Sequence, residues 1–310
     1  MRKYHPEGKL MSTPENIAAL SSEGGLQAAM QSGQIVEARA ELCDFEHNLT
    51  VDLGCMRGFI PRSEAAMGIT ADRSRDISVI SRVNRPVCFK VQGFFMHRGC
   101  RTALLSRALA QSECFERYIS RLDCGRIISA VITHNEGFGS FADIGCGIIA
   151  LLPIDCISVS RISHPADRLR PGQEILAAVK SVDGQGRVCL THKELLGTWE
   201  ENAAAFSAGQ TCSGIIRSVE DYGVFVELQP NLAGLAESRE GAAVGQLAGV
   251  FIKSIIPSKM KIKLVIIDSF MGEHIPYVPR YYVEGDRIDV WRYSPLECEK
   301  IIESRFIPNS

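Results

Sequence analysis

The chain has 310 residues, with 34 basic against 36 acidic side chains and a formal net charge of −2. Its 45% hydrophobic and 23% charged residues are typical of a folded, soluble protein rather than of a disordered chain. The charge balance excludes a protein that coats nucleic acid through a strong overall positive field, so any polyanion must be bound locally.

No apolar run approaches the roughly 18 to 20 residues that a membrane-spanning helix needs. The basic start of the chain, MRKYHPEGKL, is followed by no apolar core or cleavage site of a secretory signal. We therefore expect a cytoplasmic protein with no membrane partner. The chain has 11 cysteines, none spaced as in a zinc ribbon, and most lie in apolar runs such as RPVCFKV. This pattern predicts reduced thiols buried as small hydrophobic groups, with no metal site.

Two short helices are expected at the start of the chain. Thr13 is a suitable N-cap for the stretch TPENIAAL, and Pro14 fits the first helical position. A second apolar stretch, GLQAAMQSG, follows and ends at Gly33.

Three segments then repeat one pattern, each opening with a glycine and an alternating apolar stretch, at Gly33, Gly125 and Gly209. Short runs of period two, separated by Gly, Pro and polar turns, are typical of all-β units. About five strands in roughly 70 to 80 residues suits a small closed Greek-key barrel, the OB fold. The sequence predicts a mainly β protein of three tandem five-stranded OB-type barrels joined by short α-helices.

Helical periodicity lies between and after the barrels. Phe115, Tyr118, Ile119 and Leu122 share one helix face before the second repeat, and KELLGTWEENAAAF after it has a similar apolar side. The run from Ser294 to Glu297 is typical of a capping box that opens a C-terminal helix. We expect six segments: an N-terminal helical segment at 1–32, a degenerate OB-type repeat at 33–107, a linker helix at 108–123, an OB repeat with its following helix at 124–206, an OB repeat at 207–268, and a C-terminal hairpin and helix at 269–310.

The stretch from Gly125 to Lys193 resembles the S-one domain, the RNA-binding OB domain repeated in small-subunit ribosomal protein one. The motifs that carry the resemblance are FGSFADIG, ISHPADRLRPGQEI and VDGQGRVCLTHK. The third repeat matches about as well through YGVFVELQPNLAGLAE, and the first matches in outline through VDLGCMRGFIPRSE. The resemblance implies a shortened, bacterial type of ribosomal-protein-one-like chain that binds RNA. The three repeats together cover most of the chain.

A sequence-tolerant binder of single-stranded RNA needs aromatic platforms beside local positive charge. Phe138 and Phe141 are three residues apart, so a regular strand would place them on opposite faces. Gly139 between them permits a bend or bulge that turns both rings to one surface. Tyr222 and Phe225 repeat the arrangement in the third barrel. The sequence predicts that these four rings stack on nucleobases.

The resemblance adds further positions. It places Asp183 and Arg187 of the second repeat at the acidic and basic positions that flank the last turn of the family's binding surface. Pro153 replaces a histidine of that surface. In the third repeat Glu237 replaces the histidine, and Lys261 matches the basic position.

The residues themselves predict a basic strand face in the third repeat. Lys259, Lys261 and Lys263 alternate with apolar residues, which places three ammonium groups on one side of a strand. Arg217 is expected to reinforce this patch. The alternative is an ordinary solvated strand face, just as the four rings are also compatible with plain barrel residues.

The first repeat departs most from the pattern. His47 and Thr50 occupy its aromatic positions, Pro61 replaces the histidine, and Phe45 is out of register. We interpret residues 33–107 as a barrel that has lost its stacking platform and docks to the ribosome or to RNA-processing proteins.

No catalytic pattern emerges, because the seven histidines are scattered and the chain has no phosphate-binding glycine loop or nucleophile elbow. We expect no enzyme, no cofactor and no metal. The leading hypothesis is a translation-related protein that binds single-stranded RNA, either mRNA or rRNA. The alternative is a protein-interaction or assembly module of the ribosome or of an RNA-processing complex.

Overall fold

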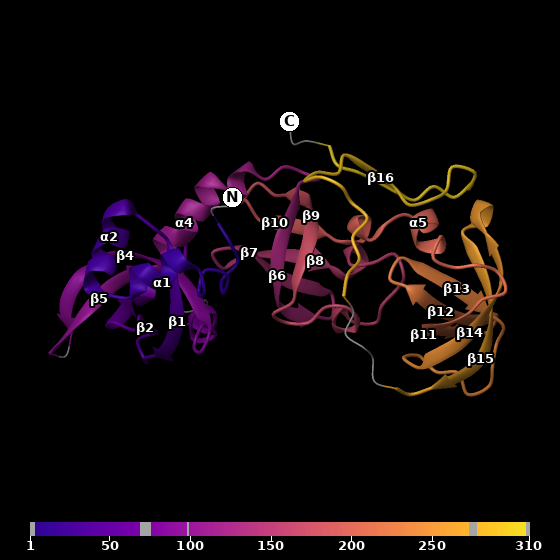
Figure 1. The fold of residues 1–310 in the computed structure, drawn as a ribbon, viewed down its shortest axis with the longest axis horizontal. Coiled ribbons are helices and arrows are strands. Elements are labelled where there is room, and N and C mark those ends of the chain that lie inside the picture. The colour runs from indigo at the N-terminus through magenta and orange to yellow at the C-terminus, as the bar shows by residue number, and fades with distance from the viewer. Residues whose placement is uncertain (1–3, 69–75, 98, 273–277, 308–310) are drawn as a thin grey trace. The chain divides into compact units, whose positions relative to one another are not determined.

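The computed structural model describes residues 4–68, 76–97, 99–272 and 278–307 (Figure 1). The described chain is mainly β and contains three closed five-stranded barrels, which confirms the expected fold class. It divides into two compact units, one of Met1–Leu122 with Asp143–Ile149 and one of Asp123–Ala142 with Ala150–Ser310. Within those described ranges, no helix combines the length and the apolar character that crossing a membrane requires.

The first barrel closes in the strand order β1-β2-β3-β5-β4. Its interior is filled by alternate strand residues such as Val36 and Phe89, and Leu26 from the preceding helices belongs to the same core. The β3 and β5 strands run parallel, and the other neighbours run antiparallel. The strands are β1 Val36–Cys43, β2 Leu49–Asp52, β3 Arg57–Ile60, β4 Pro86–His97 and β5 Cys100–Ser106.

The second barrel has the strand order β10-β8-β7-β6-β9, again with one parallel pair, between β8 and β10. The end of β7 and the start of β8 lie in the stretch Asp143–Ile149, which packs with the first unit. The strands are β6 Ile127–Glu136, β7 Gly139–Gly145, β8 Ile148–Pro153, β9 Glu174–Val182 and β10 Val188–Thr191.

The third barrel has the strand order β11-β12-β13-β15-β14. The burial of β15 alternates strictly between exposed and buried residues from Lys261 to Ile266, as a strand with one face on the core requires. The strands are β11 Thr211–Glu220, β12 Gly223–Gln229, β13 Leu232–Ala236, β14 Leu247–Ile256 and β15 Lys261–Phe270.

The N-terminal helices form as expected. Helix α1 spans Pro14–Leu20, and the Thr13 hydroxyl accepts a hydrogen bond from the Asn16 amide at 3.3 Å. Helix α2 spans Glu23–Ser32 and ends at Gly33, whose φ of 66° is the left-handed conformation that glycine adopts without strain. A short helix α3, Asp76–Ile80, precedes β4.

The helix expected after each of the first two barrels has a different outcome. Helix α4, Arg107–Arg117, connects the first barrel to the second, and a single 3-10 turn continues it. The single helix expected after the second barrel is wrong. A 3-10 turn at Lys193–Leu196 and helix α5, Trp199–Ala203, form instead. The break falls at Gly197, which has a φ of 87°, and the next residue, Thr198, starts a new capping box.

The C-terminal helix expected from Ser294 is also wrong. The segment is a hairpin in which β16, Val290–Arg292, pairs with β17, Glu303–Arg305. The Ser294 hydroxyl accepts a hydrogen bond from the Ile302 amide at 2.8 Å, so it closes the hairpin loop instead of capping a helix. Residues 273–277 and 308–310 of this segment lie outside the described residues.

All 11 cysteines are free thiols, and those at 88, 114, 124, 146, 156 and 298 are buried. Within the described residues, no cluster of His, Cys, Asp and Glu has the arrangement of a metal site.

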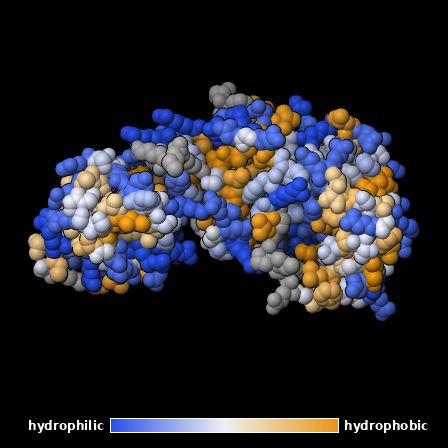
Figure 2. All heavy atoms as spheres, viewed as in Figure 1, coloured by the Kyte–Doolittle hydropathy of each residue, from blue (hydrophilic) through white to orange (hydrophobic). Residues whose placement is uncertain are grey.

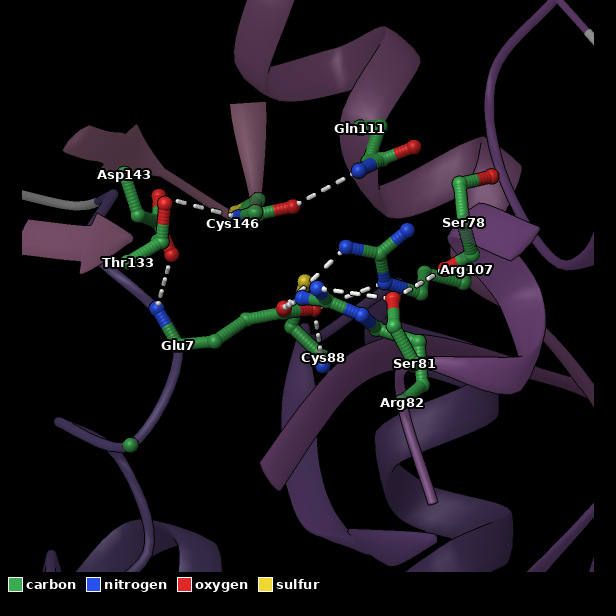
Figure 3. Close-up of polar contacts among 12 residues, drawn as sticks. Glu7, Ser78, Ser81, Arg82, Cys88, Arg107, Gln111, Thr133, Asp143 and Cys146 are labelled. Atoms are coloured by element: carbon green, nitrogen blue, oxygen red, sulfur yellow. Dashed lines mark hydrogen bonds and ion pairs between the residues drawn. The ribbon is translucent and has the colours of Figure 1, made fainter. Parts of the chain in front are cut away.

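Glu7 lies at the centre of a buried polar cluster in the first unit (Figure 3). Arg107 donates to both of its carboxylate oxygens, at 2.7 and 3.0 Å, and the Cys88 amide donates at 3.1 Å. Burial opposes ionisation of Glu7, but the Arg107 guanidinium outweighs it and holds the pKa of Glu7 below its usual value. The Glu7 amide in turn donates to Asp143 at 2.7 Å, which attaches the stretch Asp143–Ile149 to this unit. The hydrogen bonds of Glu7 with Arg107, Cys88 and Asp143 thus join the N-terminal segment to the rest of this unit.

Candidate nucleic-acid interface

The two rings predicted for the second barrel face outward together. Phe138 is 59% exposed, and Phe141 on β7 is half-buried. Their ring centroids lie 5.9 Å apart at an interplanar angle of 88°, an edge-to-face pair. An exposed edge-to-face pair leaves ring surface to which a flat ligand can stack.

A third ring, which the sequence analysis missed, extends this platform. His134 on β6 is exposed and stacks on Phe141 at 4.5 Å between centroids, with an interplanar angle of 10°. The sequence signal for this ring was the two-residue hairpin turn at 137–138. Counting the same number of residues from that turn along both strands places His134 opposite Phe141.

The third barrel repeats the ring pair. Tyr222 is 70% exposed, Phe225 on β12 is half-buried, and their centroids lie 6.1 Å apart at 87°. The two barrels therefore present nearly identical geometry at equivalent places. The outward orientation that the sequence analysis expected is present, whereas the role of the rings in binding stays a prediction.

The reason for this orientation differs from the bend expected at the glycine. Phe138 and Tyr222 lie in the hairpin turns that precede β7 and β12, so strand alternation does not apply to them. Gly139 and Gly223 are needed for close approach instead. A Cβ at Gly139 would lie 2.6 Å from the Leu152 carbonyl oxygen, and one at Gly223 would lie 2.4 Å from the Ala236 carbonyl oxygen. The paired strand passes too close for any side chain.

Positive charge lies on the same face of the third barrel. In the strand register Phe225 is opposite Leu235, and Leu235 is opposite Lys263. Paired residues point to the same side of a sheet, and neighbouring strands lie about 4.8 Å apart. The Lys263 backbone is therefore about 10 Å from that of Phe225, within the span of one nucleotide's base and phosphate.

Two expectations about this basic face are wrong. Lys259 is exposed but lies in the 3-10 turn Pro257–Lys259, so only Lys261 and Lys263 share the strand face. Arg217 does not reinforce the patch, because its guanidinium donates to Glu227 at 2.9 Å and lies 3.8 Å from Asp167. Glu227 also forms a buried ion pair with Arg168, which precedes β9.

The two turn residues of the second barrel form an ion pair with each other. Arg187 donates to Asp183 at 2.7 Å, with 75% of the arginine side chain exposed. The Arg187 amide and side chain, both hydrogen-bonded to Asp183, lower the pKa of that carboxyl. The pair is exposed and screened by solvent, so it contributes little free energy. It therefore orients the guanidinium and can be broken easily when a phosphate binds. Pro153 is the N-cap of the next 3-10 turn, and Glu237 follows β13 on the surface.

The first barrel lacks a ring pair at the corresponding positions. His47 lies in the β1–β2 turn with a φ of 64°, 3.6 Å from Asp76, and Thr50 is on β2. Pro61 is the N-cap of the 3-10 turn Arg62–Glu64, as Pro153 is in the second barrel. Phe45 is 90% exposed in the turn.

A cavity of about 1020 Å³ lies in the second unit, at the other ends of the third-barrel strands. Arg168, Glu227 and Asp268 are among its lining residues. It is separate from the ring face, which lies where β12 and β15 begin. The face of the molecule drawn in Figure 2 is hydrophilic surface interrupted by separate hydrophobic patches.

Comparisons with known proteins find an S1-type domain and bS1 relatives. Residues 122–193 match the model of the S1 RNA binding domain family. Small ribosomal subunit protein bS1 of Leuconostoc lactis is 27% identical over 277 residues, which cover 83% of this chain and 60% of that protein. The bS1 protein of Rhizobium meliloti is 25% identical over 273 residues, with coverages of 83% and 47%.

Among solved structures, an a/eIF2alpha-aDim2p-rRNA complex from Pyrococcus horikoshii OT3 contains a similar chain, with a TM-score of 0.23 and 21% identity. The match covers 27% of this chain and 51% of that one, and a score this low establishes no common arrangement of the whole chain. The chain spans about half the length of the two bS1 relatives described above. It carries an S1-type domain at residues 122–193, and over most of its length it resembles small ribosomal subunit protein bS1.

Proposed function

We propose that this protein binds single-stranded RNA on the outer faces of its second and third barrels. The observation that carries the proposal is the repeated pair of outward rings, of which Phe138 is 59% and Tyr222 is 70% exposed. Large rings left in water at equivalent places in two barrels have no packing role that would retain them, whereas a nucleobase would cover them.

The rings supply most of the affinity in this proposal. Base stacking on an aromatic side chain contributes about 1 to 3 kcal/mol and tolerates any base, because every base has a π-face. The edge-to-face geometry of Phe138 and Phe141 allows one base to stack on the first ring and to contact the edge of the second. His134 stacks on the inner ring, Phe141.

The cations fix the position of the RNA strand on the barrels and determine how strongly its affinity depends on salt. Lys261 and Lys263 extend from the same strand face as the third-barrel rings, and Arg187 extends from a turn of the second barrel. Each phosphate contact to a single strand adds about 0.7 to the slope of log affinity against log salt. With few cations and a net charge of −2, the affinity should depend only moderately on salt.

The relatives suggest where such binding is used. Ribosomal-protein-one-like chains carry several S1-type domains, and we place this protein with mRNA or rRNA in translation, in the cytoplasm and without catalytic activity. Ribosome association belongs to the same proposal, because the chain matches only part of each bS1 relative described.

A second candidate function is a protein-interaction or assembly module of the ribosome or of an RNA-processing complex. The first barrel favours it, because His47 and Thr50 stand where the other barrels carry rings. A stoichiometric protein partner that co-purifies without nucleic acid would support this reading.

The test is a fluorescence-anisotropy titration of the full chain with matched single-stranded RNA and DNA oligomers at several salt concentrations. We expect saturable binding of RNA with a shallow salt slope. Absence of binding to any RNA at low salt would contradict the proposal.

A further inference from the structure

The first barrel has a cluster of rings that its sequence did not reveal. Phe59 on β3 stacks on His97 of β4, with 5.3 Å between ring centroids and an interplanar angle of 28°. Phe95, also on β4, contacts both in edge-to-face geometry, at 6.0 Å from Phe59 and 5.8 Å from His97. All three side chains are partly exposed.

These rings lie on the outer face of the barrel. Phe59 pairs with Leu104 of β5, and Phe95 pairs with Thr102, so the rings reach toward each other across β5. The interior residue between those two on β5, Ala103, is fully buried. The rings cover Thr102, which is only 4% exposed although it faces away from the core.

The strand register shows how this cluster relates to the rings of the third barrel. There Phe225 on β12 is opposite Leu235 on β13. In the first barrel, Thr50 on β2 is opposite Phe59 on β3. The ring has therefore moved by one strand, about 4.8 Å, while remaining on the same face of the same barrel topology.

We propose that Phe59, Phe95 and His97 form a relocated nucleobase platform, through which the first barrel also binds single-stranded RNA. This inference rests on the proposed function of the other two barrels and replaces the expectation that the first barrel has lost its platform. The cluster is hereafter called the Phe59 platform.

The charge beside the Phe59 platform favours a nucleic acid as the occupant. Arg57 lies two residues before Phe59, on the same face of β3, and is exposed. It forms no ion pair with any residue in the described ranges, so its guanidinium is available to a phosphate. Its strand neighbour Asp52 already accepts a hydrogen bond from the Gly54 amide at 2.8 Å.

The platform differs from the third barrel in its cations. Leu104 stands opposite Phe59 where Lys263 stands opposite Leu235. One arginine thus replaces two strand lysines, and we expect binding at the first barrel to depend less on salt than binding at the third.

The test uses the full chain in a background that removes the other rings, with Phe138, Phe141, Tyr222 and Phe225 all changed to Ala. Phe59→Leu is then added to this background. It gives the first barrel the residue that the third barrel has at the same register position, a leucine. Phe270→Leu is the matched control, because Phe270 is 56% exposed at the far end of β15. Affinity for a short fluorescein-labelled RNA is measured by anisotropy, and circular dichroism checks the fold.

We expect the background variant to retain weak binding, Phe59→Leu to reduce it by roughly five- to 150-fold, the effect of one stacked base, and Phe270→Leu to leave it unchanged. Loss of all binding in the background variant, or equal binding with and without the Phe59 ring, would overturn the platform while leaving the proposed function intact. Failure of the wild-type chain to bind RNA would instead overturn the proposed function. Loss of a co-purifying protein by Phe59→Leu, with RNA binding unchanged, would assign the cluster to a protein partner and also overturn the inference.

Discussion

The first and third barrels have the same strand order and different outer faces. In the third barrel, Phe225, Leu235 and Lys263 follow one another across β12, β13 and β15. The corresponding series in the first barrel is Thr50, Phe59 and Leu104 across β2, β3 and β5. A ring and a smaller residue have exchanged strands, and an aliphatic residue has taken the place of a lysine.

This difference shows which positions the fold constrains. The interior residues that alternate with these, such as Gly58, Ala103 and Val226, are buried and hold the barrels closed. The outward positions contribute little to stability, because surface substitutions usually change it by less than about 0.5 kcal/mol. Ligand chemistry can therefore be redistributed over one barrel topology without loss of the fold.

The largest expected effect separates the barrels by their rings. Changing Phe138 and Phe141 to Ala, or Tyr222 and Phe225 to Ala, removes an exposed stacking pair from one barrel. Each double variant should weaken RNA binding by roughly five- to 150-fold, since a stacked base contributes about 1 to 3 kcal/mol. Anisotropy titrations measure the affinities, and an unchanged affinity in both variants would exclude these faces as the binding surface.

Acid should weaken the unit that contains the second and third barrels through His192. This side chain is buried, its Nδ1 donates to the Ile157 carbonyl at 3.1 Å, and burial lowers its pKa to about 4. Its pKa in the unfolded chain is about 6.5. The unfolded state therefore binds a proton that the folded state does not, and stability is lost as the pH falls from about 6.5 toward 4.

The expected loss from this group is about 2 kcal/mol at pH 5 relative to pH 7. Urea unfolding followed by tryptophan fluorescence measures it, because Trp199 and Trp291 both lie in the core of the third barrel. His192→Asn should remove this part of the pH dependence. An equal loss between pH 7 and 5 in wild type and variant would show that another group is responsible.

A smaller effect separates the barrels by their cations. Changing Lys261 and Lys263 to Gln should lower the slope of log affinity against log salt by about 1.4, the contribution of two phosphate contacts. Lys253→Gln, on the neighbouring strand β14, is a matched control for a general change in charge. Equal slopes for all three proteins would mean that these ammonium groups do not contact phosphate.

The smallest effect sharpens the comparison by grafting. Leu104→Lys places a lysine in the first barrel at the position of Lys263 in the third. It should steepen the salt slope by about 0.7 and raise the affinity by a few-fold at low salt. The measurement is made in the variant that lacks the other four rings, so that only the first barrel contributes. A slope that does not change there would place the RNA away from Leu104.

Much of the fold follows from local pattern. Alternation such as that from Lys261 to Leu264 defines strands, and capping residues such as Thr13 define helix starts. The helix expected at Ser294 fails because neighbouring residues, Trp291 and Tyr293, are buried in the third-barrel core and fix the segment as a hairpin. Long-range packing of this kind leaves no signal in a capping motif.

The site residues also divide into those that a local sequence pattern predicts and those that depend on long-range packing. The ring pairs could be predicted because the two rings of each pair lie within one hairpin, three residues apart in the sequence. Arg217 was misassigned, because it lies at a β-bulge in the β11–β12 pairing, where strand alternation no longer predicts which side chains meet, and there it pairs with Glu227. The Phe59 platform was invisible, because β3 and β4 are brought together only through β5, which follows both in the chain.

The most direct test of the central claim is ultraviolet crosslinking of the full chain to a short single-stranded RNA, with the crosslinked peptides identified by mass spectrometry. We expect adducts on the peptides that contain Phe138 and Phe141 and on those that contain Tyr222 and Phe225. Adducts confined to other surfaces, such as the cavity beside Arg168, would contradict it.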